Sequence, residues 1–172
     1  ISIWKTNVPQ RIQIFLWLVV RNKLLTRDNL LKRQHVADPT CLFCNEAESV
    51  NHLLFYCVVA RELWREIFSP IGSNIELNSH GLLDWWARND NKTADIMLHA
   101  AALWALWRYR NDIYFNVVPW LGMQVMWQKT ASFLTLWEIK CADTVQRRCR
   151  LLVQRMEHLA RAPPLLVWPD PG

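Results

Sequence analysis

Three cysteines and one histidine lie close together in the stretch CLFCNEAESVNHLLFYC, which spans residues 41–57. The spacing is Cys41-x2-Cys44-x7-His52-x4-Cys57. A C-x2-C turn brings two thiolates to one ion with little strain, and zinc takes four nitrogen or sulfur ligands in a tetrahedron. Three cysteines and a histidine fill all four positions, which is typical of a structural site rather than a catalytic one with a bound water. The pattern predicts a structural Zn²⁺ ion held by these four residues.

The last two ligands constrain the chain between them. Residues five apart on a straight α-helix lie about 140° apart around its axis. His52 and Cys57 therefore cannot both face one ion from an undistorted helix. We expect a helix end or kink between them, with Cys57 opening a helix over residues 58–68. Residues 53–55 (LLF) should then pack inward and seal the site.

The cysteines allow other interpretations. Cysteine is often buried as a small hydrophobe, so the cluster could be three buried thiols beside a surface histidine. The spacing also differs from the retroviral-type knuckle, C-x2-C-x4-H-x4-C, so that motif's binding surface should not be assumed. Five cysteines in total, three of them clustered, favour metal binding in a reducing compartment over disulfides. Cys141 and Cys149 are expected on helices, and the isolated histidines, His35, His80, His99 and His158, at the surface or in packing roles.

The composition favours a helical fold. Apolar residues make up 52% of the 172-residue chain and there are only four glycines, so long apolar-periodic runs point to helices rather than tight hairpins. We predict a mainly α protein, in which a small helical zinc-binding domain precedes long helices, with little or no sheet. The expected divisions are a zinc-binding domain at 1–68, a loop or hinge with a short helix at 69–92, a helical region ending in a long basic helix at 93–161, and a Pro-rich linker at 162–172.

Local signals place the helices. Pro9 suits the first position of a helix whose apolar face runs to about Lys23, and that face contains Ile12, Phe15, Leu16 and Val19. Thr26 is an expected N-cap for a short second helix, and Thr93 for a strong helix over residues 94–115. Residues 69–81 are the expected loop, and 82–90 a short helix. Residues 120–161, interrupted only by Gly122, predict one very long helix or two in series.

Basic residues gather at both ends of the chain. Net charge is +5 overall, and residues 1–40 contain seven Lys/Arg against two Asp. The candidate nucleic-acid contacts are Lys5, Arg11, Arg21, Lys23, Arg27, Lys32 and Arg33, with Arg147, Arg148 and Arg150 in the C-terminal helix. Trp4 and Trp17 lie among the first group. At helical spacing we expect them in the core, although exposed rings could stack on unpaired bases.

The order of these features resembles the reverse-transcriptase zinc-binding domain of plant LINE-type (non-LTR) retrotransposons. The resemblance covers about residues 3–68 and rests on IWKTNVPQRIQIFLWLVVRNKLLTRDNLLKR, the Cys₃His stretch and ARELW after it. It implies a domain downstream of the polymerase that grips template RNA or target DNA, with zinc in a structural role. The later ALWALWRYRNDIYF resembles the helix that often follows in such polyproteins.

Two functional hypotheses remain open. One is a nucleic-acid-binding accessory module of a reverse transcriptase, and the other is a scaffold that docks onto the polymerase and a ribonuclease H-like domain, or pairs with itself through the long helices. One contiguous face formed by the seven N-terminal basic residues would favour the first hypothesis, and scattered positions of these residues would favour the second. Paired carboxylates, a nucleophile elbow and a Gly-rich phosphate loop are absent from the sequence, so we expect no enzyme activity. No signal peptide or membrane-spanning run is visible, and we expect a nuclear or cytoplasmic setting.

Overall fold

The computed structural model describes residues 3–34, 38–69, 78–115 and 118–162. The elements in chain order are the 3₁₀ turn η1 (Ile3–Lys5), α1 (Gln10–Val20), α2 (Arg27–Leu31), the π-helical turn η2 (His52–Tyr56), α3 (Val58–Phe68), α4 (Ser79–Arg88), α5 (Thr93–Tyr114), α6 (Met123–Glu138) and α7 (Asp143–Arg161). Within these ranges there is no strand, only an isolated antiparallel bridge between Thr40 and Ala47. The mainly α prediction is confirmed.

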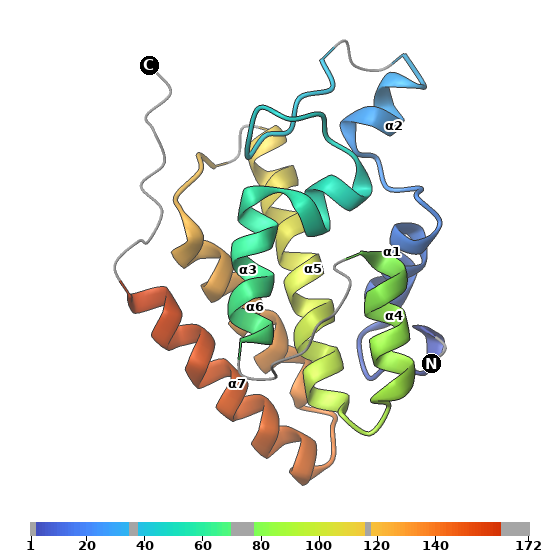
Figure 1. Cartoon of the computed structure of the whole chain (residues 1–172). Helices are drawn as coiled ribbons and strands as arrows, with labels where there is room; N and C mark the ends of the chain where they lie inside the picture. Colours follow the sequence, from blue (N-terminus) through green and yellow to red (C-terminus); the bar gives the residue numbers. More distant parts are fainter. Residues whose placement is uncertain (1–2, 35–37, 70–77, 116–117, 163–172) are drawn as a thin grey trace.

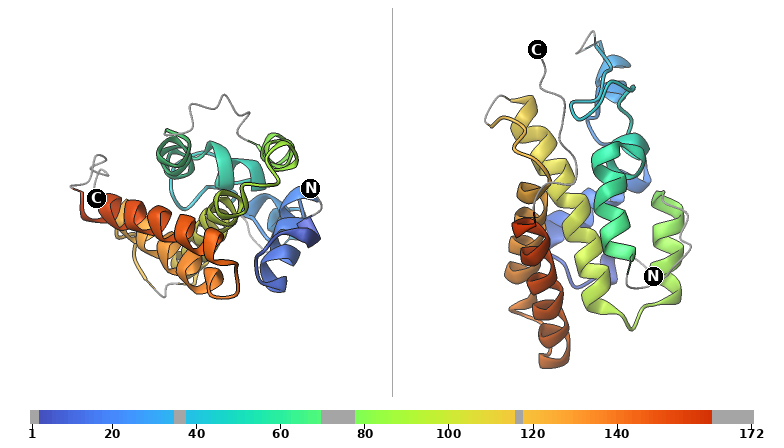
Figure 2. Two further views of the ribbon diagram at one scale, coloured as in Figure 1. Left: turned by 90° about the horizontal axis from the view of Figure 1, so that it is seen from below. Right: turned by 60° about the vertical axis from the view of Figure 1, so that its left-hand side comes forward.

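Helix α5 runs through the middle of the molecule (Figure 1). Its neighbours include α1, η2 and α3, and the α6–α7 pair lies against another side (Figure 2). A helix covered from several directions must be apolar around most of its circumference. The run Ala100–Ala102 and Ala105 meets this need, because each is fully buried and has a small side chain that lets neighbouring helices approach. The buried residues of α1, α3 and α4 and those of α5–α7 form one continuous hydrophobic core. The domain boundaries at 68 and 93 stay predictions.

Helix α1 packs as its apolar spacing predicts. The residues Ile12, Phe15, Leu16 and Val19 are all buried, and the ring of Phe15 meets Trp104 of α5 edge-on at 5.0 Å. Pro9 lies at the N-cap rather than inside the helix. The helix ends at Val20, where Asn22 takes a left-handed backbone conformation with φ of 52°. Thr26 precedes α2 at its N-cap, as expected.

Trp4 and Trp17 are not core residues. Their exposed fractions are 53% and 41%, so the expectation that both are buried is wrong. On α1, Trp17 lies about 150° around the axis from the middle of the buried face. Four other apolar residues fill that face, and Trp17 stays exposed because no described element covers the opposite side. Trp4, in η1, precedes the helix and is equally uncovered.

The long C-terminal segment is a helical hairpin rather than one helix or two in series. Helices α6 and α7 lie side by side along their length (Figure 2). The chain reverses over residues 139–142, where Ala142 is extended with ψ of 151°. Cys141 therefore lies in a turn and not on a helix, whereas Cys149 is buried in α7. The turn contains no Gly or Pro, so no local signal in the sequence marks it.

Two helix starts also differ from expectation. Thr93 is the first residue of α5, and Lys92 precedes it as the N-cap. Helix α4 begins at Ser79, because the side chain of Asn78 accepts a hydrogen bond from the Gly81 N–H at 2.8 Å and caps the helix. The predicted loop at 69–81 is therefore shorter at its C-terminal end. Its residues 70–77 lie outside the described part, as do His35 and the linker from residue 163.

None of the described helices is both long and apolar enough to cross a lipid bilayer.

His99 lies inside the core among aromatic rings. Its Nδ1 accepts a hydrogen bond from Trp86 Nε1 at 3.1 Å, and the rings of Phe68 and Trp85 lie 4.9 Å away. The side chain is fully buried, and desolvation lowers the pKa of this imidazole from 6.5 to about 3. His99 is therefore a neutral packing residue. His80 and His158 are exposed.

The depressed pKa of His99 predicts an acid-sensitive stability. The folded state keeps His99 neutral down to about pH 3, while the unfolded chain takes up the proton below about pH 6.5. Stability is therefore complete above pH 6.5 and falls by about 1.4 kcal/mol for each pH unit below it. In His99→Asn, the amide oxygen can still accept from Trp86. The free energy of unfolding of this variant, measured by urea denaturation between pH 7 and 5, should fall less steeply with decreasing pH than that of wild type, by the contribution of one proton. His158→Asn should keep the wild-type slope, and parallel curves for wild type and His99→Asn would contradict this account.

Candidate metal centre

A tight turn places the first two cysteines. The bridge between Thr40 and Ala47 closes the loop, and the Cys41 N–H donates to the Glu46 carbonyl oxygen at 2.8 Å. The Phe43 N–H points at the Cys41 sulfur, with nitrogen and sulfur 3.4 Å apart. This backbone pattern turns the Cys41 and Cys44 side chains to the same side of the loop.

The π turn η2 places the other two ligands. Ser49 starts the helical turn by accepting a hydrogen bond from the His52 N–H at 3.1 Å. The Cys57 N–H then donates to the His52 carbonyl oxygen at 2.7 Å, a bond between residues five apart. This widened turn brings His52 and Cys57 toward one side, which an α-helix cannot do. Cys57 itself is extended, and α3 begins at Val58. The predicted kink is confirmed, and its form is a π turn.

The four candidate ligand atoms converge on one point. All lie within 4.8 Å of one another. The Cys57 sulfur is 3.9 Å from the sulfurs of both Cys41 and Cys44, and Cys44 Sγ is 3.2 Å from His52 Nε2. Tetrahedral zinc with ordinary bond lengths separates two sulfurs by about 3.8 Å and sulfur from nitrogen by about 3.5 Å. The donor set and its spacing fit a zinc ion, and we propose these four side chains as its ligands.

Glu46 orients the histidine. Its carboxylate lies 3.2 Å from His52 Nδ1, which leaves Nε2 directed at the cysteines. A carboxylate that accepts from the outer nitrogen of a ligating histidine fixes the ring and its tautomer. Sequence reasoning missed this residue, because its position between two ligands looks like that of an ordinary loop acid.

The thiols influence one another's acidity. The pKa of Cys41 is lowered to about 6, first by its hydrogen bond with Cys57 and further by contacts with Phe43 and His52. The same pairing, together with burial, raises the pKa of Cys57. Burial is the largest cause of the raised pKa of Cys44. The cluster thus favours one thiolate, at Cys41, and the thiolate is the form that binds zinc.

Apolar residues close the site from within. Leu53, Leu54 and Phe55 have exposed fractions of 1% or less, as the sequence predicts. Trp64 of α3 donates a hydrogen bond from Nε1 to the Leu54 carbonyl oxygen at 2.7 Å and stacks on Phe55 with 5.9 Å between ring centroids. These contacts satisfy a buried carbonyl and fix α3 against the π turn.

Comparison with known proteins agrees with this geometry. Residues 2–64 match the family described as zinc-binding in reverse transcriptase, and all four candidate ligands lie inside the match. This segment is similar to the reverse-transcriptase zinc-binding domains. The predicted resemblance is confirmed, and the cofactor that it implies is a structural zinc ion.

A second comparison reaches beyond the zinc-binding domain. Over 115 residues the chain is 27% identical to an Arabidopsis thaliana protein named "Putative ribonuclease H protein". The alignment covers 63% of this chain and 18% of that relative, so the chain spans less than a fifth of the relative's length. No solved structure matches the chain.

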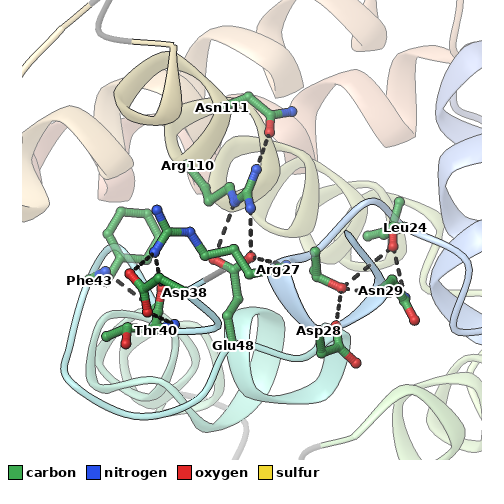
Figure 3. A network of polar contacts seen from close by, with 12 residues as sticks. Leu24, Arg27, Asp28, Asn29, Asp38, Thr40, Phe43, Glu48, Arg110 and Asn111 are labelled. Atoms are coloured by element: carbon green, nitrogen blue, oxygen red, sulfur yellow. Dashed lines mark hydrogen bonds and ion pairs between the residues drawn. The ribbon is translucent and has the colours of Figure 1, made fainter. Parts of the chain in front are cut away.

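A buried ion pair joins the zinc-binding domain to α5. Figure 3 shows the Glu48 carboxylate, from the end of the zinc loop, meeting the Arg110 guanidinium through two hydrogen bonds. Arg110 Nη2 donates to Oε1 at 2.6 Å, and its Nε donates to Oε2 at 3.2 Å. The exposed fractions of the two side chains are 0% and 2%. Glu48 Oε1 also accepts from the Arg27 N–H at the start of α2 at 2.8 Å. One carboxylate thus connects the loop, α2 and α5.

Phe43 adds an apolar contact to the same junction. It is buried, and its ring centroid lies 6.4 Å from that of Tyr109 and 5.3 Å from that of Trp120. The residue between the first two cysteines therefore anchors the loop on α5 and on the segment that follows it. Its local sequence, CLFC, does not indicate this role.

The candidate nucleic-acid residues do not share one face. Lys5, Arg11, Arg21, Lys23, Lys32 and Arg33 are exposed in the N-terminal part. The residues on α7 lie on the other side of α5 from α1 (Figure 2). Among them, Arg148 pairs with Asp95 at 2.9 Å and Arg150 lies 3.7 Å from Glu138, while Arg147 is exposed.

Arg27 has a structural role that the sequence did not suggest. Its Nη1 donates to Asp38 and to the Thr40 carbonyl oxygen, both at 2.8 Å (Figure 3), and its guanidinium lies over the Tyr114 ring. These contacts hold it against the zinc loop. Arg27 is thus less available to a phosphate than its exposed neighbours.

The metal cluster predicts the effect of losing one ligand. Cys44→Ser leaves three good ligands and should release zinc and unfold the region around residues 38–68. Structural zinc contributes about 10–16 kcal/mol of apparent binding free energy in small peptides, comparable with the ~5–15 kcal/mol total stability of a domain. Metal content and far-UV circular dichroism measure both effects. Cys141→Ser, outside the cluster, should keep zinc. Stoichiometric zinc and full helicity in Cys44→Ser would rule out the structural site.

The ion pair predicts a second stability effect. Glu48→Gln keeps the side-chain shape but leaves the Arg110 charge buried without its partner. Breaking one side of a buried pair costs about 3–5 kcal/mol, and urea denaturation at saturating zinc measures the loss. Glu157→Gln removes a half-exposed partner of Arg161 and should change stability little. Equal losses in the two variants would show that Glu48 does not hold the junction.

Proposed function

We propose that this chain is an accessory module of a retrotransposon reverse transcriptase that grips template RNA or target DNA and performs no catalysis. The observation that supports it most is the charge of the N-terminal part. The sequence has no acidic residue before Asp28. Lys5, Arg11, Arg21 and Lys23 are all exposed, and none forms an ion pair with a described residue.

These cations suit phosphate rather than a fixed base sequence. Lysine and arginine on a surface release counterions when they neutralise phosphates, which gives affinity with little sequence preference. Lys32 and Arg33 extend the basic surface beyond α2. Helix α7 lies on another side of the molecule (Figure 2) and offers a second contact for a long nucleic acid through Arg147, which is exposed and forms no ion pair with a described residue.

Zinc would act on this surface indirectly. Four protein ligands leave no open position for a substrate or an activated water. The ion instead holds the loop whose Glu48 carboxylate binds the first N–H of α2. The position of Lys32 and Arg33, at the other end of α2, thus depends on the zinc loop. The polyprotein's own polymerase is the expected neighbour in this function.

A charge-removal experiment tests the proposal. Fluorescence anisotropy of the zinc-loaded chain with RNA and DNA, over a salt series, should show affinity that falls log-linearly with salt. Arg11→Gln/Lys23→Gln should weaken binding to all sequences. The slope of log affinity against log salt concentration should become shallower by about 1.4 for single strands, which is about 0.7 for each lost contact.

Arg61→Gln/Arg88→Gln is the matched control. Both arginines are exposed, on α3 and α4, and unpaired among the described residues, so binding should stay near wild type. Equal losses of affinity in the two double variants would show that binding depends on net charge and not on the position of the N-terminal cations. Absence of binding to RNA and DNA at low salt would contradict the proposed function.

A docking scaffold is the second candidate, and exposed apolar residues favour it. Leu136 and Ile139 at the end of α6 are 56% and 67% exposed. They border a groove of about 480 Å³ between residues 7–9 and the α6–α7 turn. A polymerase, a ribonuclease H-like domain or a second copy could dock there. The docking scaffold becomes the favoured function if the chain binds no nucleic acid.

A further inference from the structure

The outer face of α1 combines aromatic and basic side chains. Ile14, Trp17 and Arg21 are exposed and lie on the side of the helix away from its buried residues, and Arg11 is exposed on its flank. An indole ring is costly to leave in water, so an exposed tryptophan among cations indicates a ligand with both a flat apolar surface and negative charge.

Trp4 is held next to this face. The Gln13 side-chain amide donates to the carbonyl oxygens of Trp4 at 3.5 Å and Thr6 at 3.0 Å. Gln13 precedes Trp17 by four residues, so the two lie one helical turn apart on the same side of α1. These bonds fix η1 against the helix and place the backbone of Trp4 about one turn from Trp17.

The two indole rings have few internal partners. Arg21 lies over Trp17, with its guanidinium carbon 5.9 Å from the ring centroid. Neither Trp4 nor Trp17 forms a ring–ring contact with a described residue. Elsewhere in the molecule the tryptophans are mostly packed, as with Trp64 and Trp86, which are almost wholly buried. The exposure of Trp4 and Trp17 is thus a local property of η1 and α1.

We propose that η1 and α1 form a binding site for unpaired nucleotides, in which bases stack on Trp17 and Trp4 and the flanking phosphates pair with Lys5, Arg11, Arg21 and Lys23. This inference rests on the proposed nucleic-acid function and specifies its ligand as single-stranded. A base paired inside a duplex cannot present its face to an indole ring, whereas an unpaired base can. Stacking is tolerant of sequence, so the site takes single-stranded RNA or DNA.

The charge pattern favours this ligand over a protein. The sequence up to Arg27 holds five basic residues and no acidic residue. A protein partner would need both carboxylates that match these cations and an apolar surface for two indole rings. A nucleic acid strand carries both features, because it offers phosphates and flat bases along its whole length.

The experiment compares single strand with duplex. The zinc-loaded chain is titrated into fluorescein-labelled 12-nucleotide dT and U strands and into a 12-base-pair duplex, at one salt concentration. Wild type should prefer the single strands. Trp17→Leu and Trp4→Leu should each weaken single-strand binding by roughly 10-fold, since stacking contributes about 1–3 kcal/mol per base. Duplex affinity and the salt slope should not change.

Phe115→Leu is the control, because Phe115 is an aromatic residue with 68% exposure at the end of α5. It should bind like wild type, and circular dichroism should show all three variants folded. Wild-type affinity for single strands in both tryptophan variants would overturn this inference and leave the phosphate grip intact. If wild type binds none of these nucleic acids, the proposed function is overturned instead. If the chain binds only phosphatidylserine vesicles, and this binding depends on the tryptophans, the face formed by η1 and α1 contacts a membrane surface and not nucleotides.

Discussion

His52 and Cys57 must reach a single point although five residues separate them, and the π turn η2 is the conformation that allows it. The bond from the Cys57 N–H to the His52 carbonyl oxygen widens the helix at this turn. The same widening directs residues 53–55 into the core, where Trp64 binds the Leu54 carbonyl oxygen. The path of α3 against α5 thus follows from the position of two candidate ligands. The proposed metal coordination therefore also sets the direction of α3.

Glu48 extends this constraint to the rest of the molecule. Its carboxylate caps α2 and holds Arg110 through two hydrogen bonds, so the zinc loop, α2 and α5 meet at one buried charge. Burying such a pair costs desolvation energy, and good geometry offsets this cost. The pair therefore fixes orientation more than it adds stability. Through it, the proposed metal site positions exposed cations on α2 that the ion would not touch.

The sequence predicts the parts of the site that depend on local spacing. The four candidate ligands follow from a short motif, and the kink follows from the geometry of a helix. Glu48 and Arg110 lie 62 residues apart, so no local pattern joins them. Trp17 lies on the face of α1 opposite its buried residues, and whether that second face is covered depends on tertiary packing. The turn at 139–142 has no Gly or Pro and arises where α7 folds back to bury Cys149, Leu152 and Met156 against α5 and α6.

Hydrogen–deuterium exchange with and without zinc tests the central claim, that the metal organises the loop, the π turn and the helices attached to them. Chelation should increase exchange most strongly in residues 38–68. It should also increase exchange in α2 and in the part of α5 around Arg110, which Glu48 connects to the loop. The amides of α6 and α7 should change least. Unchanged protection of η2 and α3 after zinc removal would contradict the account.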